Sequence, residues 1–182
     1  MRENISGKRI KLKRPVFNIE NAKVIYSVIN RCRDVFSPWL DWANGTNSAD
    51  DTLKFLEKAD DDWKNNTQFV YEIHVGEKFA GLISAINIVR QHKRAEIGYW
   101  LGTENTGKGF MAEAVSLLEK ELFADGFNRI VIQTDVLNAK SAGVAKRCGY
   151  ILEGVLRQER YSERLGRFRD TNVFSKLKAD LK

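Results

Sequence analysis

Residues 96–113 read EIGYWLGTENTGKGFMAE, an apolar strand-like segment followed by a glycine-rich loop and the start of an amphipathic helix. Apolar side chains recur at helical spacing as far as Phe123, which predicts a helix over residues 107–126 that ends with Gly126 in a left-handed conformation. The first amides of a helix have no acceptor within the helix, and glycine lets an anion approach them closely. This junction therefore predicts a phosphate-binding loop.

One interpretation of the loop is a nucleotide triphosphate site. Gly102, Gly107 and Lys108 satisfy the pattern G-x-x-x-x-G-K-[ST] up to its last position, where Gly109 stands in place of serine or threonine. Glycine has no hydroxyl with which to hold magnesium. The sequence therefore disfavours a triphosphate hydrolase and predicts no metal site.

The composition is typical of one globular domain over residues 1–182, since 43% of the residues are hydrophobic and 30% are charged. The N-terminal residues lack the apolar core of a signal peptide, and no later apolar run is long enough to span a bilayer. We therefore expect a cytoplasmic protein with no membrane partner. Cys32 and Cys148 lie far apart, without companions at metal-binding spacing, which predicts reduced and buried thiols.

The net charge of +6 favours anionic partners but does not choose among coenzyme A, nucleic acid and an acidic protein. No aromatic and basic RNA motif and no recognition helix is present, so we expect no nucleic-acid partner. One local excess of arginine is open to two interpretations, a solvated hairpin or a docking surface for an acidic substrate. It comprises Arg157, Arg160, Arg164, Arg167 and Arg169.

Periodicity and capping residues predict an α/β fold. We expect helices from Asn18, from Ser48 to the residue before Asn65, and over residues 138–147, with a loop after Ser37-Pro38. The expected strands are residues 9–16, 68–75, 79–89, 96–101, 129–134, 150–155 and 168–177.

The strands at residues 96–101 and 129–134 flank the long helix, so they should be parallel neighbours. A ligand can enter where such a pair diverges. The expected architecture is a mixed, mostly antiparallel sheet of six to seven strands, splayed between its two central parallel strands and flanked by about four helices.

Several motifs along the chain resemble those of the GCN5-related N-acetyltransferase (GNAT) superfamily. Gly107-Lys108-Gly109 and the residues after it resemble the superfamily's pyrophosphate loop. Its second signature is matched by Asn138, Ser141, Ala145, Arg147, Gly149 and Tyr150. The RimJ/RimL branch of ribosomal-protein N-terminal acetyltransferases is matched by Arg9-Ile10-Lys11-Leu12, Pro38-Trp39-Leu40, Leu152-Glu153-Gly154, Leu156-Arg157, Gly166 and Asp170.

The resemblance implies a GNAT fold that binds acetyl-coenzyme A without a metal. The amides of residues 107–111 would hold the pyrophosphate, and the main chain of residues 100–102 would pair with the pantetheine arm as an added strand. Three of the lysines, Lys108, Lys140 and Lys146, would neutralise phosphate groups or remain solvated helix charges. The predicted cofactor-binding residues are Trp100, Leu101, Gly102, Gly107, Lys108, Gly109, Phe110, Met111, Asn138, Lys140, Ser141 and Lys146.

Three residues are candidates for proton transfer. Glu96 begins the strand that should flank the thioester, so it is a candidate base or else a structural carboxylate near Arg94. The resemblance implies that Ser141 serves the departing thiolate; the alternative is a polar residue without a role in turnover. The tyrosine that many GNAT enzymes use as the proton donor is replaced by Ala145. The branch's glutamate base falls in a segment of uncertain register, which leaves Glu159 as a secondary candidate.

The expected function is transfer of an acetyl group to an α-amino group of a protein or peptide, such as an acidic ribosomal protein. An α-amino group with a pKa near 8 is partly neutral in cells, so a modest base suffices. Cys148 has no neighbouring histidine in sequence, since His74 and His92 are distant, and direct attack in a ternary complex is therefore favoured over an acetyl-cysteine.

Several alternatives stay open at this level. The acceptor can instead be a small amine such as a polyamine or an aminoglycoside, or the chain can be a non-catalytic coenzyme A-binding protein. Phe36, Trp39 and Trp42 form either a wall of the acceptor groove or a cap on the core. The sequence leaves both a monomer and a homodimer open.

Overall fold

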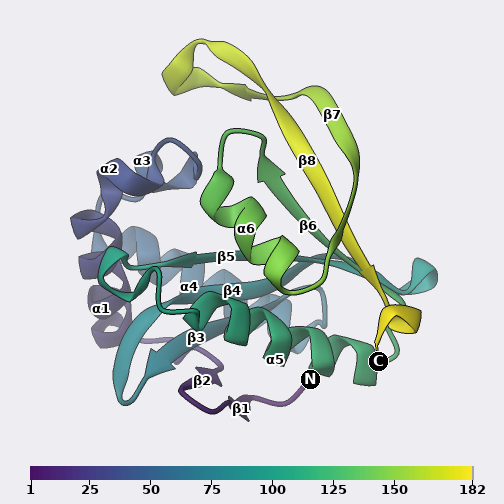
Figure 1. The fold of residues 1–182 in the computed structure, drawn as a ribbon. Coiled ribbons are helices and arrows are strands. Elements are labelled where there is room, and N and C mark those ends of the chain that lie inside the picture. Colours follow the sequence, from purple (N-terminus) through teal and green to yellow (C-terminus); the bar gives the residue numbers. More distant parts are fainter. Residues whose placement is uncertain (182) are drawn as a thin grey trace.

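A mixed sheet of eight strands organises the molecule, and the computed structural model describes residues 1–181 (Figure 1). The strand order is β1-β2-β3-β4-β5-β6-β8-β7, in which β5 and β6 are parallel and all other neighbours are antiparallel. The strands are β1 Asn4–Ser6, β2 Ile10–Lys13, β3 Phe69–Val75, β4 Lys78–Val89, β5 Arg94–Leu101, β6 Arg129–Asp135, β7 Ile151–Ser162 and β8 Arg167–Leu177. The helices are α1 Ile19–Arg31, α2 Arg33–Phe36, α3 Trp42–Gly45, α4 Ala49–Lys64, α5 Phe110–Ala124 and α6 Ala139–Arg147.

The sheet has one strand more than the six to seven that the sequence predicts. The additional strand is β1, which has three residues and pairs with β2 from Asn4↔Lys13 to Ser6↔Lys11. Only Ile5 of β1 is buried, so the segment carries too few apolar positions for alternation to be recognised. Its strand conformation depends on pairing with β2.

Three of the predicted helix starts are confirmed, and each depends on a local side-chain cap, whereas the helix predicted from residue 107 begins at Phe110 and has no side-chain cap. Asn18 accepts a hydrogen bond from the amide of Asn21 at 2.8 Å, and Ser48 accepts one from the amide of Asp51 at 3.1 Å. Asn138 caps α6 in the same way. The segment after Ser37-Pro38, expected to be a loop, also contains the four-residue helix α3.

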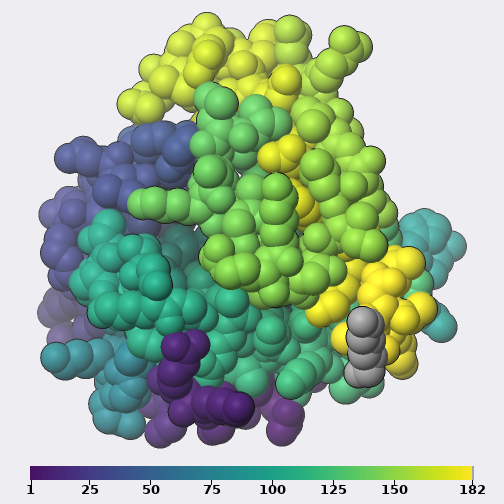
Figure 2. Space-filling view, in the orientation of Figure 1, coloured from purple at the N-terminus to yellow at the C-terminus, as the bar shows by residue number. Residues whose placement is uncertain are grey.

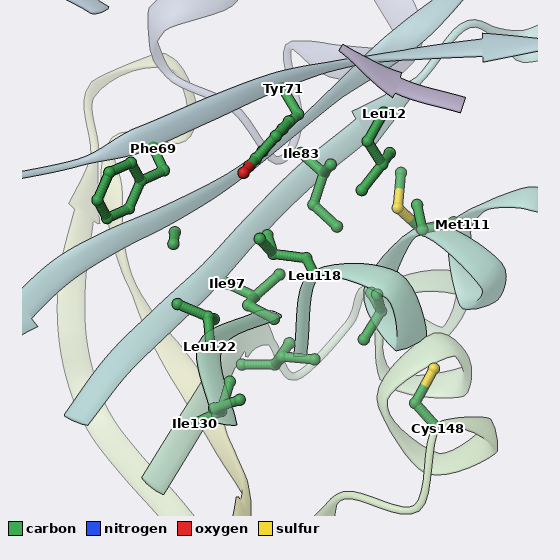
Figure 3. Close-up of a cluster of buried hydrophobic side chains, with 14 of the residues drawn as sticks. Leu12, Phe69, Tyr71, Ile83, Ile97, Met111, Leu118, Leu122, Ile130 and Cys148 are labelled. Atoms are coloured by element: carbon green, nitrogen blue, oxygen red, sulfur yellow. The ribbon is translucent and has the colours of Figure 1, made fainter. Parts of the chain in front are cut away.

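Two hydrophobic clusters cover the two faces of the sheet. On one face α5 and α6 pack over alternate residues of the central strands, including Tyr71 and Ile97 (Figure 3). On the other face α1 and α4 pack over the intervening residues, including Val70 and Trp100. Successive strand residues point to opposite faces, so β5 presents Tyr99 to the α5 side and Trp100 to the α1 side. Among residues 1–181, no helix combines the length and apolar character needed to cross a membrane.

The parallel strands β5 and β6 pair only at their N-terminal ends. Their register runs from Arg94↔Arg129 to Glu96↔Val131 and then stops. Beyond that point β5 stays paired with β4 as far as Gly81↔Leu101, whereas β6 stays paired with β8 as far as Asp135↔Thr171. The predicted divergence is confirmed, and it leaves residues 97–101 without a partner strand on the side of β6.

The hairpin of β7 and β8 extends well beyond the rest of the sheet (Figures 1 and 2). Strand β7 reaches Ser162, not residue 155 as the sequence predicts, because it continues to pair with β8. Its register shifts between Leu156 and Arg160, where Gln158 has a φ of 54° and its amide donates to Oδ1 of Asp170 at 2.8 Å. Because the pairing is irregular here, the alternation of apolar and polar residues does not predict the second half of the strand.

Candidate active site

The glycine loop presents a row of free amides at the start of α5. Gly107 and Gly109 have φ values of 76° and 79°, a conformation that favours glycine, and α5 begins at Phe110. The first backbone bond of the helix is donated by Glu113 to Gly109 at 3.2 Å. Within residues 1–181 the amides of residues 107–112 donate to no backbone acceptor. An anion can therefore accept several hydrogen bonds here and also meets the positive end of the helix dipole.

The loop is open to solvent at Gly107. A Cβ built on Gly107 meets no atom within 4 Å, so this part of the loop faces solvent. Lys108, Lys140 and Lys146 are exposed and form no ion pair within the described residues. Their predicted role toward phosphate groups stays a prediction.

Tyr99 and Ser141 meet across the line where β5 and β6 diverge. The Tyr99 hydroxyl lies 3.1 Å from Oγ of Ser141 and 3.2 Å from its carbonyl oxygen. Asn138 fixes the first turn of α6, because its side chain accepts a hydrogen bond from the amide of Ser141 at 3.1 Å. Burial raises the pKa of Tyr99 to about 12, although the hydrogen bond with Ser141 acts in the opposite direction. Tyr99 therefore stays protonated and can donate.

Tyr99 is not part of any motif that the sequence reveals. The signal that could have found it is the strand alternation, which places residue 99 on the same face as α5 and α6 and next to the predicted pantetheine strand. The usual tyrosine position on α6 is occupied by the buried Ala145. A phenol is thus present near the site, but it comes from β5 and not from the helix.

Glu96 and Glu159 lie apart from this pair. Glu96 lies where β5 is still paired with β6, on the opposite face of β5 from Tyr99, and it accepts a hydrogen bond from Nδ2 of Asn87 at 3.0 Å. Its observed partner is thus Asn87 and not Arg94. Glu159 is on the hairpin, where it pairs with Arg160 at 3.0 Å and accepts a hydrogen bond from Thr171. Neither carboxylate touches Ser141, so both roles stay predictions.

Cys148 directly follows α6, and its thiol is buried and forms no disulfide, as predicted. Burial raises its pKa to about 11, so the reactive thiolate is rare at neutral pH. Its sulfur donates to the carbonyl oxygen of Ala112 at 3.6 Å. His74 is engaged elsewhere, 2.7 Å from Glu72. These surroundings disfavour a covalent route through Cys148.

The predicted aromatic residues divide between core and surface. Phe36 is buried, with its ring centroid 5.2 Å from that of Trp100. Trp42 also packs on Trp100, at 6.1 Å, but is 42% exposed. Trp39 is half-buried. Phe36 is therefore a core residue, whereas for the more exposed Trp42 a place in the wall of an acceptor groove stays a prediction.

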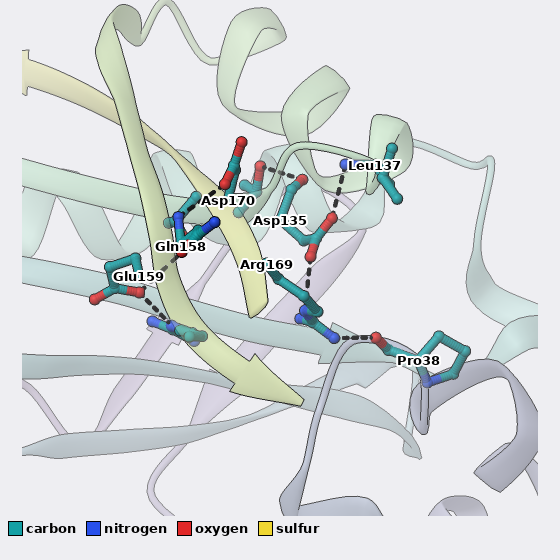
Figure 4. Close-up of polar contacts among 10 residues, drawn as sticks. Pro38, Asp135, Leu137, Gln158, Glu159, Arg169 and Asp170 are labelled. Carbon is teal, nitrogen blue, oxygen red and sulfur yellow. Dashed lines mark hydrogen bonds and ion pairs between the residues drawn. The ribbon is translucent and has the colours of Figure 1, made fainter. Parts of the chain in front are cut away.

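The arginine cluster of the hairpin is only partly a solvated surface. Arg157, Arg160, Arg164 and Arg167 are exposed. Arg169 instead lies 2.8 Å from Oδ2 of Asp135, with only 9% of its side chain exposed. It also donates to the carbonyl of Pro38 at 2.5 Å, as Figure 4 shows. Arg169 thus connects β8, the end of β6 and the loop before α3, a contact that sequence could not show.

Residues 14–151 match the family described as Acetyltransferase (GNAT) domain. The chain therefore belongs to the GNAT acetyltransferases, and its fold is the GNAT fold. Within that family it resembles the ribosomal-protein N-acetyltransferase branch, as the motifs indicate.

Two curated relatives carry this resemblance. The ribosomal-protein-serine acetyltransferase of Escherichia coli (strain K12) is 28% identical over 158 residues, which cover 86% of this chain and 87% of that protein. The putative ribosomal N-acetyltransferase YdaF of Bacillus subtilis (strain 168) is 30% identical over 166 residues, 88% of each chain.

Two solved structures that are similar to this chain contain coenzyme A or acetyl-CoA. RimL, a ribosomal L7/L12 α-N-protein acetyltransferase, was solved in complex with coenzyme A; it has a TM-score of 0.90 at 25% identity, with 98% of this chain and 99% of that chain covered. The microcin C7 self-immunity acetyltransferase MccE was solved with acetyl-CoA and AMP. It has a TM-score of 0.88 at 33% identity, with 94% and 93% covered.

Proposed function

We propose that this protein transfers an acetyl group from acetyl-CoA to the α-amino group of a protein or peptide, by direct attack in a ternary complex. The observation that carries the proposal is the arrangement at the end of β5. An unpaired strand edge at residues 97–101 runs toward the free amides of residues 107–112, and the Tyr99–Ser141 pair lies beside it.

The strand edge and the amides suit two adjoining parts of coenzyme A, the pantetheine arm and the pyrophosphate. The unpaired main-chain edge at residues 97–101 offers donors and acceptors to the amide groups of pantetheine, as in the addition of a strand to a sheet. Gly102 does not extend this edge, because its amide already donates to Ala80 and its carbonyl accepts from Asn105. The amides of residues 107–111 offer donors to the pyrophosphate. Bound this way, the thioester lies where β5 and β6 diverge, because residues 97–101 border that split.

The reaction needs one bond formed, one broken and one proton moved. The neutral amine nitrogen attacks the thioester carbonyl carbon, the C–N bond forms and the C–S bond breaks. One proton leaves the nitrogen and one is taken up by sulfur. Ser141 passes a proton to sulfur and regains one, through water, from the proton that the amine releases, and the Tyr99 hydroxyl orients Ser141 through their 3.1 Å contact. Glu96, through water, is the candidate that accepts the proton from the amine.

A protein N-terminus is the preferred acceptor. The two curated relatives that match most of this chain are described as a ribosomal-protein-serine acetyltransferase and a putative ribosomal N-acetyltransferase. The exposed arginines of the hairpin would attract an acidic segment behind the reacting amine. An acceptor on the ribosome places the reaction in the cytoplasm.

A small amine linked to a nucleotide is the second candidate. It is favoured by one observation, the 33% identity to an immunity acetyltransferase whose structure contains AMP as well as acetyl-CoA. The positive charge of this chain suits a phosphate-bearing acceptor better than a polyamine.

Mass spectrometry after incubation with acetyl-CoA tests the proposal. The acceptors are peptides that begin with serine or alanine and continue with acidic or neutral residues, together with spermidine, an aminoglycoside and an aminoacyl adenylate analogue. A matched peptide with a blocked N-terminus and a free lysine is the control for α-amine specificity. Acetylation of the free N-terminus alone supports the proposal. Modification of only the small amines, or no turnover with any acceptor, contradicts it.

A further inference from the structure

Arg9, the residue before β2, reaches onto the glycine loop from a distant part of the chain. Its Nη1 donates to the carbonyl of Lys108 at 2.8 Å. Its Nε and its backbone amide donate to the two carboxylate oxygens of Glu113, each at 2.9 Å. The guanidinium carbon also lies 5.2 Å from the centroid of the Phe110 ring. One side chain thereby joins the loop to the first turn of α5.

The contact with Lys108 fixes the orientation of a peptide group. Glycines with positive φ lie on both sides of Lys108, and glycine allows the adjoining peptide planes to rotate at little cost. In a trans peptide the carbonyl and the N–H point in opposite directions. Because the Lys108 carbonyl points to Arg9, the N–H of Gly109 points away from Arg9. The hydrogen bond therefore holds this amide in one orientation before any ligand arrives.

Arg9 also neutralises the carboxylate in the first turn of α5. Glu113 is in the first turn of α5, and its side chain is 15% exposed. Burial raises the pKa of Glu113, but the hydrogen bonds and charge of Arg9 outweigh that effect and hold the pKa below its ordinary value. Glu113 is therefore ionised, and without Arg9 its negative charge would oppose an anion at the neighbouring amides.

We propose that Arg9 is a positioning residue for the diphosphate of coenzyme A: it orders the amide loop through the Lys108 carbonyl and cancels the charge of Glu113. The inference rests on the proposed function, in which the amides of residues 107–111 hold that diphosphate. It predicts a defect that depends on the diphosphate itself. A donor without that group, S-acetylpantetheine, should not sense the loss of Arg9.

Arg2 offers a matched control on the same helix. It also comes from the N-terminal segment and pairs with a glutamate of α5, Glu121, but it makes no contact with the loop. Arg9→Met and Arg2→Met each remove one arginine–glutamate pair from α5. Arg9→Lys keeps the charge but lacks the planar fork that bonds both partners.

The experiment measures coenzyme A affinity by calorimetry, and kcat/KM with acetyl-CoA and with S-acetylpantetheine. We expect Arg9→Met to weaken coenzyme A binding about tenfold, the size of one charge-assisted hydrogen bond, and to reduce the preference for acetyl-CoA over S-acetylpantetheine by a similar factor. Arg9→Lys should show a smaller change in the same direction. Arg2→Met should bind coenzyme A like the wild type.

The outcomes separate this inference from the proposed function. If the wild type binds coenzyme A and Arg9→Met binds it equally well, the inference is wrong. It is also wrong if both donors lose the same factor, since that result indicates general damage to the fold. If Arg9→Met does not fold, the same comparison is made with Arg9→Lys: an unchanged preference for acetyl-CoA over S-acetylpantetheine contradicts the inference. Failure of the wild type to bind coenzyme A instead contradicts the proposed function.

Discussion

The hydroxyl of Tyr99 lies 3.1 Å from Oγ of Ser141, so the unpaired end of β5 is connected to the first turn of α6. The connection orders a serine hydroxyl beside the strand edge that we assign to pantetheine. A protonated phenol with a pKa raised to about 12 by burial can donate at any physiological pH. The pair is thus suited to orient a proton donor.

Replacing Ser141 should reduce turnover more than donor binding. We expect Ser141→Ala to lower kcat about 100-fold with little change in the KM for acetyl-CoA, because the lost hydroxyl acts on the leaving sulfur. Tyr99→Phe should lower kcat about tenfold, and the double variant should resemble Ser141→Ala because the two residues act as a unit. Steady-state kinetics measure all three.

The control for this pair is Tyr26→Phe, which removes a hydroxyl that bonds to the carbonyl of Asn47 and not to Tyr99 or Ser141. It should keep the wild-type kcat. Additive effects of the Tyr99 and Ser141 substitutions would show that the phenol does not act through the serine.

A methyl group in the glycine loop should impair coenzyme binding through the backbone. The added methyl group of Gly107→Ala meets no neighbour within 4 Å, so the substitution causes no clash. It instead strains the backbone by about 1 kcal/mol, because residue 107 has a φ of 76°. The loop can relieve this strain only by changing conformation. We expect the KM for acetyl-CoA to rise about five- to tenfold, which corresponds to a binding free energy of roughly 1 kcal/mol. Gly154→Ala on β7, which also meets no neighbour and lacks a positive φ, should leave this KM unchanged.

Removal of Arg169 should destabilise the fold, since it leaves Asp135 as a buried, unpaired charge. We expect Arg169→Met to lower the free energy of unfolding by about 3 kcal/mol, as measured by urea titration. Arg160→Met, which breaks a half-exposed pair with Glu159, should cost less than about 1 kcal/mol. Equal losses in the two variants would contradict the assignment of Arg169 as a buried anchor.

Acid should remove the contribution of one surface pair. The hydrogen bond from Arg129 holds the pKa of Glu153 at about 2 in the folded protein, compared with about 4.3 when unfolded. A carboxyl whose pKa is lowered by folding stabilises the fold above its unfolded pKa, and this stabilisation is lost as the pH falls toward the folded value. Because 41% of the Glu153 side chain is exposed, the contribution should be below about 1 kcal/mol.

The measurement is the difference in urea midpoint between the wild type and Glu153→Gln. The difference should be constant from pH 8 to pH 5 and should shrink between pH 4 and pH 3. A difference that grows in acid would show that the Glu153 carboxyl is not held ionised by Arg129.

Local features were predicted well because their causes lie within a few residues. The caps of α1, α4 and α6, the left-handed Gly126 and the glycine loop follow from neighbouring side chains and backbone preferences. The parallel pairing of β5 and β6 also followed, because a crossover helix connects them. Short β1 and the second half of β7 were missed, since their conformation depends on a partner strand that alternation does not reveal.

The sequence by itself determined the class of fold, the position of the glycine loop and the membership of an acetyltransferase family, because motifs and periodicities are properties of contiguous residues. Only the tertiary structure decided which distant groups meet: Tyr99 with Ser141, Arg169 with Asp135, and Arg9 with Lys108 and Glu113. Such contacts depend on the register of strands and the packing of helices over the whole sheet. No single segment contains that information.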